Sequence, residues 1–337
     1  MPASSPPDPT RAERFAGSLL GQAVGDALGF VVEGHGPAAC RQHVEQVVRP
    51  RRATGWSREP YACGQYSDDT QLARELATSL VARGGFDPAD YAARVAALFA
   101  EGRVVGAGPS TEAAARRLAA GVPWHAAGTP GPVAGNGGAM RVGPLALHLA
   151  HDRAALARAA AEQARITHAD PRCAAGAVAV AGAVAAALEG TLADAERLCA
   201  ALAAEAQPLD SALAAGLQRL PRWLQQPHEE AAPQIALVGL APAAPEAGRF
   251  GIAPHVTPSV LWALYAALRH PDDIVEAVAV AIAPGGDVDT TAAMAGAIVG
   301  AAVGEGALPA VFVECVHDRG RERHDELRAL AHALAAL

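Results

Sequence analysis

The chain has 337 residues, of which 51% are hydrophobic and only 4% are aromatic, and its formal net charge is -8. A dedicated nucleic-acid binder is not expected, because such proteins gain most of their affinity from basic groups that neutralise phosphates. The sequence contains no Lys, which excludes Schiff-base catalysis by a lysine and the phosphate-binding lysine of a P-loop.

Helix-forming Ala is the dominant residue type, and runs of β-branched and aromatic residues with a period of two are scarce. Because small side chains fill little space, an Ala-rich core requires helices that pack closely. We therefore predict an all-α fold with a single domain at residues 11–337. The Pro- and Ser-rich residues 1–10 are predicted to form a disordered tail.

Helical patterns follow one another along this domain, separated by short breaks at Gly or Pro. The predicted helices span residues 11–31, 70–83, 88–101, 110–120, 139–150, 153–166, 172–188, 192–205, 209–219, 258–269, 271–282, 290–303 and 319–336. Two stretches, 34–66 and 225–257, contain many helix-breaking residues and are predicted to be long loops. Loops of this length are usually functional or mobile.

Cysteine usage and hydropathy indicate the compartment. Five Cys are scattered without a C-x-x-C pair, which is typical of reduced thiols: Cys40, Cys63, Cys173, Cys199 and Cys315. The first residues lack the apolar core of a signal peptide. The most apolar stretch, residues 174–188, is shorter than the roughly 20 residues needed to span a bilayer, so we expect a buried core helix. We expect a cytoplasmic protein without membrane contact, and a monomer is the default.

The first predicted helix carries Gly21, Gly25 and Gly29 at a spacing of four, which places them on one helical stripe. Such a stripe indicates close packing against a neighbouring helix. Asp26, within this stretch, is either a buried hydrogen-bonding group or a site residue. Glu33 lies where the helix gives way to glycines, and is a candidate general acid or base.

Two acidic motifs precede predicted helices. Ser67, Asp68 and Asp69 stand directly before the second helix, where Ser or Asp is also an ordinary N-cap. Asp287 and Asp289 follow Gly285-Gly286 and are joined by Thr290, and a capped helix again explains them equally well. If the two motifs met, four carboxylates would require one or two hard divalent cations, which prefer oxygen ligands. Their spacing in sequence does not decide whether they meet.

Two further motifs are candidates for ligand binding. Gly135, Asn136 and Gly137 form a glycine-rich turn before a helix, where exposed backbone N–H groups suit phosphate, and Asn136 is the only Asn in the chain. Gly106 belongs to a second, shorter glycine cluster of this kind. His168 lies in a turn between two helices, where it is either structural or in contact with a ligand.

In this order, the motifs resemble the ADP-ribosylglycohydrolase family, which includes dinitrogenase reductase-activating glycohydrolase and the eukaryotic ADP-ribosylhydrolases. The matching segments are GSLLGQAVGDALGFVVEG, YSDDTQLA, GNGGAMRVGPLAL, ARITHADP and GGDVDTTAAMAGAIVGA. The resemblance implies a compact orthogonal helical bundle with a binuclear cleft for two Mg2+ (or Mn2+) ions. The implied metal ligands are Ser67, Asp68, Asp69, Asp287, Asp289 and Thr290. Glu33 matches the family's catalytic glutamate, and the substrate-binding residues would be Gly106, Gly135, Asn136, Gly137 and His168.

The sequence departs from the family pattern at three places. Ser67 stands where Thr is usual, although both supply a hydroxyl. Residues 106–108 lack the acidic residue of the dinitrogenase reductase-activating enzymes, and no aromatic residue for adenine stacking stands directly before Gly135. The hydroxyl of Ser67 is expected to preserve function. The missing acidic residue weakens a direct assignment to the specificity of the dinitrogenase reductase-activating enzymes, and the third departure leaves the adenine-binding residues unidentified.

These observations predict a Mg2+-dependent hydrolase that cleaves the C1″ bond between ADP-ribose and a modified protein side chain or a small conjugate. Arginine-linked ADP-ribose is the first choice of substrate, and serine-linked ADP-ribose or O-acetyl-ADP-ribose is the alternative. A non-catalytic ADP-ribose-binding protein is an alternative of a different class. An unrelated Mg2+-dependent phosphohydrolase would instead release AMP.

Overall fold

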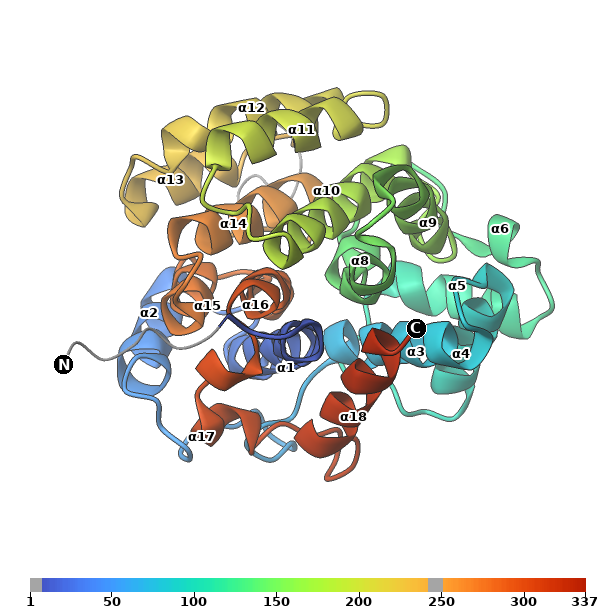
Figure 1. The fold of residues 1–337 in the computed structure, drawn as a ribbon, viewed down its shortest axis with the longest axis horizontal. Coiled ribbons are helices and arrows are strands. Elements are labelled where there is room, and N and C mark those ends of the chain that lie inside the picture. Colours follow the sequence, from blue (N-terminus) through green and yellow to red (C-terminus); the bar gives the residue numbers. More distant parts are fainter. Residues whose placement is uncertain (1–7, 242–250) are drawn as a thin grey trace.

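A computed structural model describes residues 8–241 and 251–337, and the regular structure of these residues is helical, with only isolated β-bridges between loops (Figure 1). The predicted all-α fold is confirmed. The elements are α1 (Arg11–Phe30), α2 (Pro37–His43), η1 (Val44–Val48, a π-helix), α3 (Asp68–Arg83), α4 (Pro88–Ala100), α5 (Pro109–Ala119), α6 (Trp124–Ala127), α7 (Gly137–Met140), α8 (Gly143–Leu149), α9 (Arg153–Arg165), α10 (Pro171–Leu188), α11 (Ala195–Ala206), α12 (Ser211–Trp223), α13 (His228–Ile235), α14 (Val256–Arg269), α15 (Ile274–Ile282), α16 (Val288–Val303), η3 (Glu305–Ala307, a 3-10 helix), α17 (Ala310–Val313) and α18 (His324–Ala335).

Helices α1 and α16 lie side by side at the centre of the molecule (Figure 1) and pack with their backbones in contact. A Cβ atom added at Gly25 would lie 2.1 Å from the carbonyl O of Ala292, and one added at Gly296 would lie 2.1 Å from the carbonyl O of Gly21. The glycine stripe is therefore a packing surface, as predicted. Because these pairs run in opposite directions along the two helices, the end of α1 meets the beginning of α16.

The beginning of α3 is fixed on α1 by the buried side chain of Asp26. Its Oδ1 accepts a hydrogen bond from the backbone N–H of Ser67 at 2.9 Å, and its Oδ2 accepts from the backbone N–H of Thr70 at 3.0 Å. The Thr70 hydroxyl donates to the same Oδ2 at 2.6 Å. Asp26 thus satisfies N–H groups that a helix N-terminus leaves without intrahelical partners. The first turns of α3 and α16 are both held near the end of α1.

Helix α10 crosses the interior of the protein. By length and composition it is the single candidate for a membrane span among the described residues, and 83% of its apolar window is buried inside the protein. Close packing explains its Ala- and Gly-rich sequence, since a Cβ added at Gly176 would lie 2.2 Å from a methyl group of Val256. The predicted core helix is confirmed.

Both predicted long loops contain helices. Residues 34–66 include α2 and η1, and residues 225–257 include α13. In the first case Pro37 occupies the first turn of α2, where its missing N–H costs no hydrogen bond, so this Pro begins a helix instead of preventing one. Residues 1–7 of the predicted tail, and residues 242–250, lie outside the described residues. Thr10 belongs to the folded part, since it forms a capping box with Glu13 at the start of α1.

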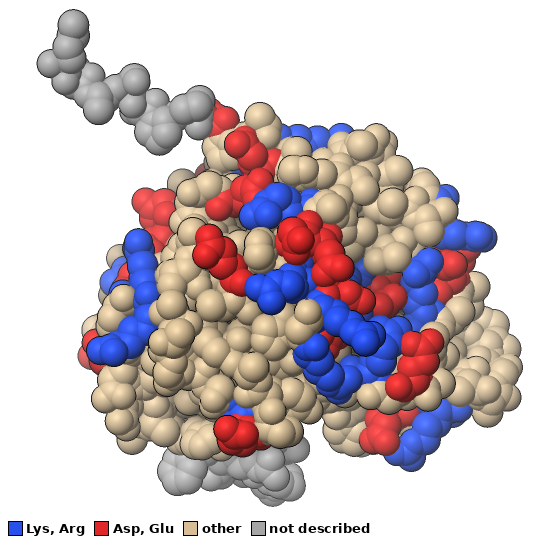
Figure 2. All heavy atoms as spheres, turned by 90° about the horizontal axis from the view of Figure 1, so that it is seen from below, with Lys and Arg blue, Asp and Glu red and all other residues tan. Residues whose placement is uncertain are grey.

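The molecular surface carries mixed charge. On the face shown in Figure 2, acidic and basic side chains lie beside one another. Exposed pairs such as Arg49 with Glu276, whose nearest atoms are 3.0 Å apart, are of this kind. The negative net charge is therefore not gathered into one patch on this face. Several Asp side chains are instead buried inside the protein.

Candidate metal centre and active site

The predicted site residues line one cleft of about 1210 Å³. Its walls come from the turn after α1, the first turns of α3 and α16, the loops at residues 106–111 and 132–137, and the segment at 252–255. Of the predicted site residues, all but Ser67 line the cleft: Glu33, Asp68, Asp69, Gly106, Gly135, Asn136, Gly137, His168, Asp287, Asp289 and Thr290. Motifs that are far apart in sequence therefore share one site.

The two acidic motifs meet at Asp69. Its Oδ2 accepts hydrogen bonds from the hydroxyl of Ser67 at 3.0 Å and from the hydroxyl of Thr290 at 3.4 Å. Its Oδ1 is buried and has no hydrogen-bond partner among the described residues. A buried carboxylate oxygen without a partner is costly, and such an atom calls for a ligand that the protein itself does not provide.

Carboxylate oxygens of the cleft form two overlapping groups. One oxygen each from Asp26, Asp69 and Asp289 lie within 4.8 Å of one another, and the same holds for Glu33, Asp287 and Asp289. Asp289 belongs to both groups. The arrangement offers hard oxygen donors at a spacing that a divalent cation can bridge.

Burial is the main cause of the raised pKa values of the carboxyls in this cluster. It raises the pKa of Asp26 to about 6, and it raises the pKa of Asp287 to about 6 as well. Burial also raises the pKa values of Asp68, Asp69 and Asp289 well above the ordinary range, and the neighbouring carboxylates add to the rise. Without a cation the cluster therefore favours protonated carboxyls, and a bound cation would favour their ionised forms.

These residues fit a hard divalent cation. All donors in the cluster are carboxylate or hydroxyl oxygens, and the soft or nitrogen ligands typical of structural zinc are missing from the two groups. Ser67 is both an N-cap and a member of this cluster, because its hydroxyl accepts from the N–H of Asp69 and donates to the Asp69 carboxylate. Asp287 is the N-cap residue of α16 but its side chain makes no capping bond, which leaves its carboxylate to the cleft.

Glu33 is held beside the second acidic motif by backbone contacts. The N–H of Gly34 donates to the carbonyl O of Gly286 at 2.8 Å. The N–H of Gly286 in turn donates to the carbonyl O of His35 at 3.1 Å. Gly286 has a φ of +92°, and a Cβ there would lie 2.2 Å from the carbonyl O of Ile252, so only glycine fits this approach.

The carboxylate of Glu33 is paired with Arg58. Arg58 Nη1 donates to Glu33 Oε2 at 2.5 Å and to the carbonyl O of Phe30 at 3.1 Å. The Arg58 guanidinium also lies 4.6 Å from the centroid of the Phe30 ring. Glu33 is about one-third exposed, with 30% of its side chain accessible. Its carboxylate is therefore accessible to a ligand in the cleft.

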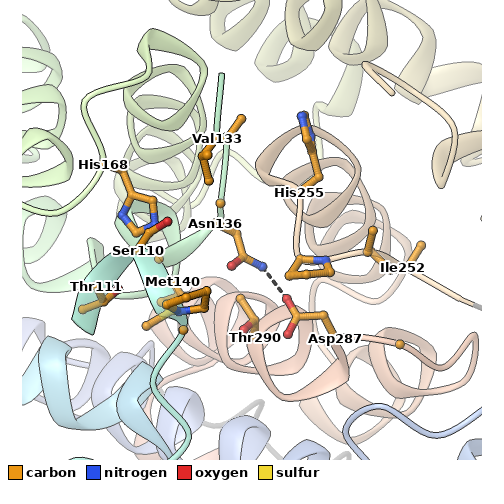
Figure 3. Close-up of a pocket in the computed structure, with 18 of the residues that line it drawn as sticks. Ser110, Thr111, Val133, Asn136, Met140, His168, Ile252, His255, Asp287 and Thr290 are labelled. Atoms are coloured by element: carbon orange, nitrogen blue, oxygen red, sulfur yellow. Dashed lines mark hydrogen bonds between the residues drawn. The ribbon is translucent and has the colours of Figure 1, made fainter. Parts of the chain in front are cut away.

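Asn136 connects the glycine-rich turn to the acidic cluster. Its Nδ2 donates to Asp287 Oδ2 at 2.5 Å, the contact drawn as a dashed line in Figure 3, and to the hydroxyl of Ser259 at 2.8 Å. Its backbone N–H donates to the carbonyl O of Pro254. The only Asn in the chain thus orients a candidate metal ligand while it lines the cleft.

The glycines of the cleft wall make room for neighbouring side chains. A Cβ at Gly137 would lie 2.7 Å from Cε1 of His168, and one at Gly135 would lie 3.0 Å from its Nε2. Gly106 has a φ of +82° and packs against Asp68, with an added Cβ 3.6 Å from its Oδ1. A larger residue at these positions would fill space beside the site.

Comparison with known proteins assigns the chain to a family. The family model for ADP-ribosylglycohydrolase matches residues 7–337. The chain belongs to the ADP-ribosylglycohydrolase family. It is 29% identical to the ADP-ribosylhydrolase ARH3 of Danio rerio over 96% of this chain and 91% of that protein. It is 37% identical to the ADP-ribosyl-[dinitrogen reductase] glycohydrolase of Rhodospirillum rubrum, over 48% of this chain and 54% of that protein.

A solved structure titled ADP-ribosylglycohydrolase-related protein complex is also similar. Its TM-score is 0.70 and its identity 31%, over 97% of this chain and 98% of that one. The predicted family resemblance is therefore confirmed over nearly the whole chain.

Several residues of the site are not indicated by the sequence motifs. Arg58 and Arg172 lie in stretches that motif spacing does not single out, yet one pairs with Glu33 and the other lines the cleft. Arg141 and Thr167 belong to quoted motifs but received no role. Arg141 and Thr167 could have been recognised by residue type, since a polar residue within an otherwise apolar, buried segment needs a hydrogen-bond partner.

Proposed function

We propose that the protein is a divalent-metal-dependent ADP-ribosylhydrolase that cleaves the bond joining C1″ of ADP-ribose to a modified protein side chain or small conjugate. One observation carries the proposal: Asp69, which has a buried oxygen without a partner in the described part of the chain, meets the second acidic motif in a cleft that Glu33 also lines. The five thiols are free in the structure, in keeping with a cytoplasmic protein.

Two Mg2+ ions, with Mn2+ as a substitute, are the proposed cofactors, and the all-oxygen donor set supports hard cations of this kind. The ions would be held by Ser67, Asp68, Asp69, Asp287, Asp289 and Thr290. When bound, such ions supply positive charge that orients ribose hydroxyls and activates water. Asn136 holds the Asp287 carboxylate in place through its 2.5 Å hydrogen bond.

Glu33 is the proposed general acid/base of the reaction. Water adds to C1″, the bond from C1″ to the side-chain nitrogen or oxygen breaks, and the departing group takes up a proton. Glu33 is suited to accept the proton of the water and return one to the departing group, because it lies in the cleft beside Asp287 and Asp289. The carboxylates nearby favour the positive charge that develops at C1″ in the transition state.

Arginine-linked ADP-ribose is the proposed substrate. The carboxylate of Glu33 already binds one guanidinium, that of Arg58, which also stacks on the ring of Phe30. A guanidinium from an ADP-ribosylated arginine has the same shape and charge, so it could replace Arg58 at this position. Serine-linked ADP-ribose and O-acetyl-ADP-ribose are the alternative substrates, and their leaving groups carry no positive charge for Glu33 to bind.

A turnover assay on defined conjugates tests the proposal. We expect release of free ADP-ribose, faster from arginine-linked than from serine-linked peptide, and loss of activity in EDTA with recovery on addition of Mg2+. Glu33→Gln is expected to lower kcat by a factor of about 10² to 10⁴ while ADP-ribose still binds. Glu45→Gln, on an exposed carboxylate, is the matched control.

Other results would reject the proposal. Full activity in EDTA would exclude the metal mechanism, and AMP as the product would indicate a phosphohydrolase. Tight binding of ADP-ribose without turnover of any conjugate would indicate a non-catalytic binding protein.

A further inference from the structure

The imidazole of His168 lies in the cleft wall, with one ring nitrogen toward the protein interior and the other toward the cleft. Its Nδ1 lies 2.8 Å from the hydroxyl oxygen of Thr167, in the protein interior. Its Nε2 lies on the other side, next to Gly135 in the wall of the cleft, and no partner within the described part of the chain contacts it. Figure 3 shows the ring of His168 on the other side of the cleft from His255.

Behind Thr167 lies Arg141, whose side chain is 0% exposed. Its Nε donates to Gln163 Oε1 at 2.9 Å, and its Nη2 donates to the carbonyl O of Gln163 at 3.0 Å and to Thr167 Oγ1 at 2.8 Å. The guanidinium also lies over the ring of Tyr91. No carboxylate pairs with it among the described residues, so it is a buried cation held only by neutral groups.

The direction of hydrogen bonding follows from these contacts. A guanidinium has donors only, so Thr167 Oγ1 must accept from Arg141. The single hydroxyl hydrogen of Thr167 is then available to His168 Nδ1, which accepts it. If Nδ1 carried the proton instead, the buried hydroxyl hydrogen would have no partner, at a substantial cost. With Nδ1 as acceptor, the proton of a neutral imidazole is on Nε2.

The ring is neutral at physiological pH. Burial, with a contribution from the charge of Arg141, lowers the pKa of His168 to about 3. Only one nitrogen therefore carries a proton, and the tautomer decides whether the cleft meets a donor or an acceptor.

We propose that Arg141 and Thr167 are positioning residues that fix His168 as the Nε2–H tautomer, so that His168 donates a hydrogen bond to a phosphate oxygen of bound ADP-ribose. The identity of the ligand rests on the proposed function, whereas the tautomer does not. The buried charge of Arg141 favours an anionic oxygen at this point of the cleft, because electrostatic interactions are stronger where water is excluded.

The tautomer is measured directly by 15N–1H correlation NMR of the histidine rings in the full chain, without ligand. We expect the proton of His168 on Nε2, with the signal assigned by its loss in His168→Gln. Thr167→Ser keeps a hydroxyl and is expected to preserve this pattern, whereas Thr167→Val is expected to weaken it. A proton on Nδ1 in the unsubstituted protein would overturn the proposal.

Affinity for ADP-ribose, measured by calorimetry, tests the consequence. We expect Thr167→Val to weaken binding about tenfold and Thr167→Ser to change it by no more than about twofold. His168→Gln can place an amide donor near the position of Nε2 and is expected to bind better than His168→Asn. Thr78→Val, which removes a half-buried hydroxyl on α3 away from the cleft, is the control.

The outcomes separate this inference from the proposed function. Equal affinity for ADP-ribose in Thr167→Val and Thr167→Ser would overturn the positioning role of Arg141 and Thr167, even if the protein hydrolyses ADP-ribose conjugates. Conversely, the expected tautomer and affinity changes in a protein that hydrolyses no conjugate would support the positioning role of Arg141 and Thr167 and reject the proposed hydrolysis.

Discussion

The replacement Asp69→Asn should stabilise the metal-free protein while removing its response to metal. Asp69 is 2% exposed, its Oδ1 has no partner among the described residues, and burial and the charges of Asp26 and Asp68 all raise its pKa. An asparagine keeps an oxygen for the hydroxyl of Ser67 and removes the buried negative charge. A residue retained only for stability would behave in the opposite way.

The magnitude follows from the linkage between protonation and folding. The pKa of Asp26 in the same cluster rises from 3.8 to about 6. Because the folded state keeps its proton where the unfolded state has lost it, stability is lost as the pH rises between these values, by about 3 kcal/mol for one such group. Removing the charge of Asp69, whose pKa is raised by the same cause, should therefore raise the metal-free free energy of unfolding at pH 7 by about 2 kcal/mol or more, which is roughly 3 °C in Tm for a chain of this length.

The assay is thermal unfolding followed by circular dichroism, between about pH 4 and pH 8, in EDTA and in Mg2+. In EDTA the unsubstituted protein should lose stability as the pH rises, and Mg2+ at about 100 times its Kd should restore about 2.7 kcal/mol. Asp69→Asn should start higher and respond little to Mg2+, whereas the exposed Asp272→Asn should behave like the unsubstituted protein. A lower Tm for Asp69→Asn in EDTA would refute the argument.

Two further substitutions test the packing and the orientation of the cluster. Gly25→Ala places a methyl group 2.1 Å from the carbonyl O of Ala292, and it should destabilise the protein by about 3 kcal/mol or more in denaturant titrations. Gly36→Ala, where an added Cβ has open space, should cost less than about 1 kcal/mol, and equal costs would contradict the backbone contact. Asn136→Asp brings a further carboxylate to Asp287, and calorimetry should show that the Mg2+ affinity changes by about tenfold or more. Asn136→Ser should change the Mg2+ affinity less. An unchanged affinity in Asn136→Asp would show that Asn136 does not orient the Asp287 carboxylate.

Much of the local structure was predictable because its causes lie within a few residues. Ser67 and Asp287 were expected before helices, and both are N-cap residues. The glycine stripe indicated close packing, and α16 supplies the partner. Pro37 shows where such reasoning was wrong, since a Pro predicted to interrupt helices begins α2. Its effect depends on its position in the helix, which composition does not reveal.

The amino-acid sequence by itself determined the all-helical class, the packing stripe of α1 and the acidic motifs at two helix N-termini, because periodicity and capping act over three or four residues. Only the tertiary structure decided that Asp69 and Thr290 meet, and that Arg141 reaches His168 through Thr167. The first contact depends on the antiparallel packing of α1 against α16, which brings the first turns of α3 and α16 together, and the second depends on which segments are buried against one another. Spacing along the chain does not specify either.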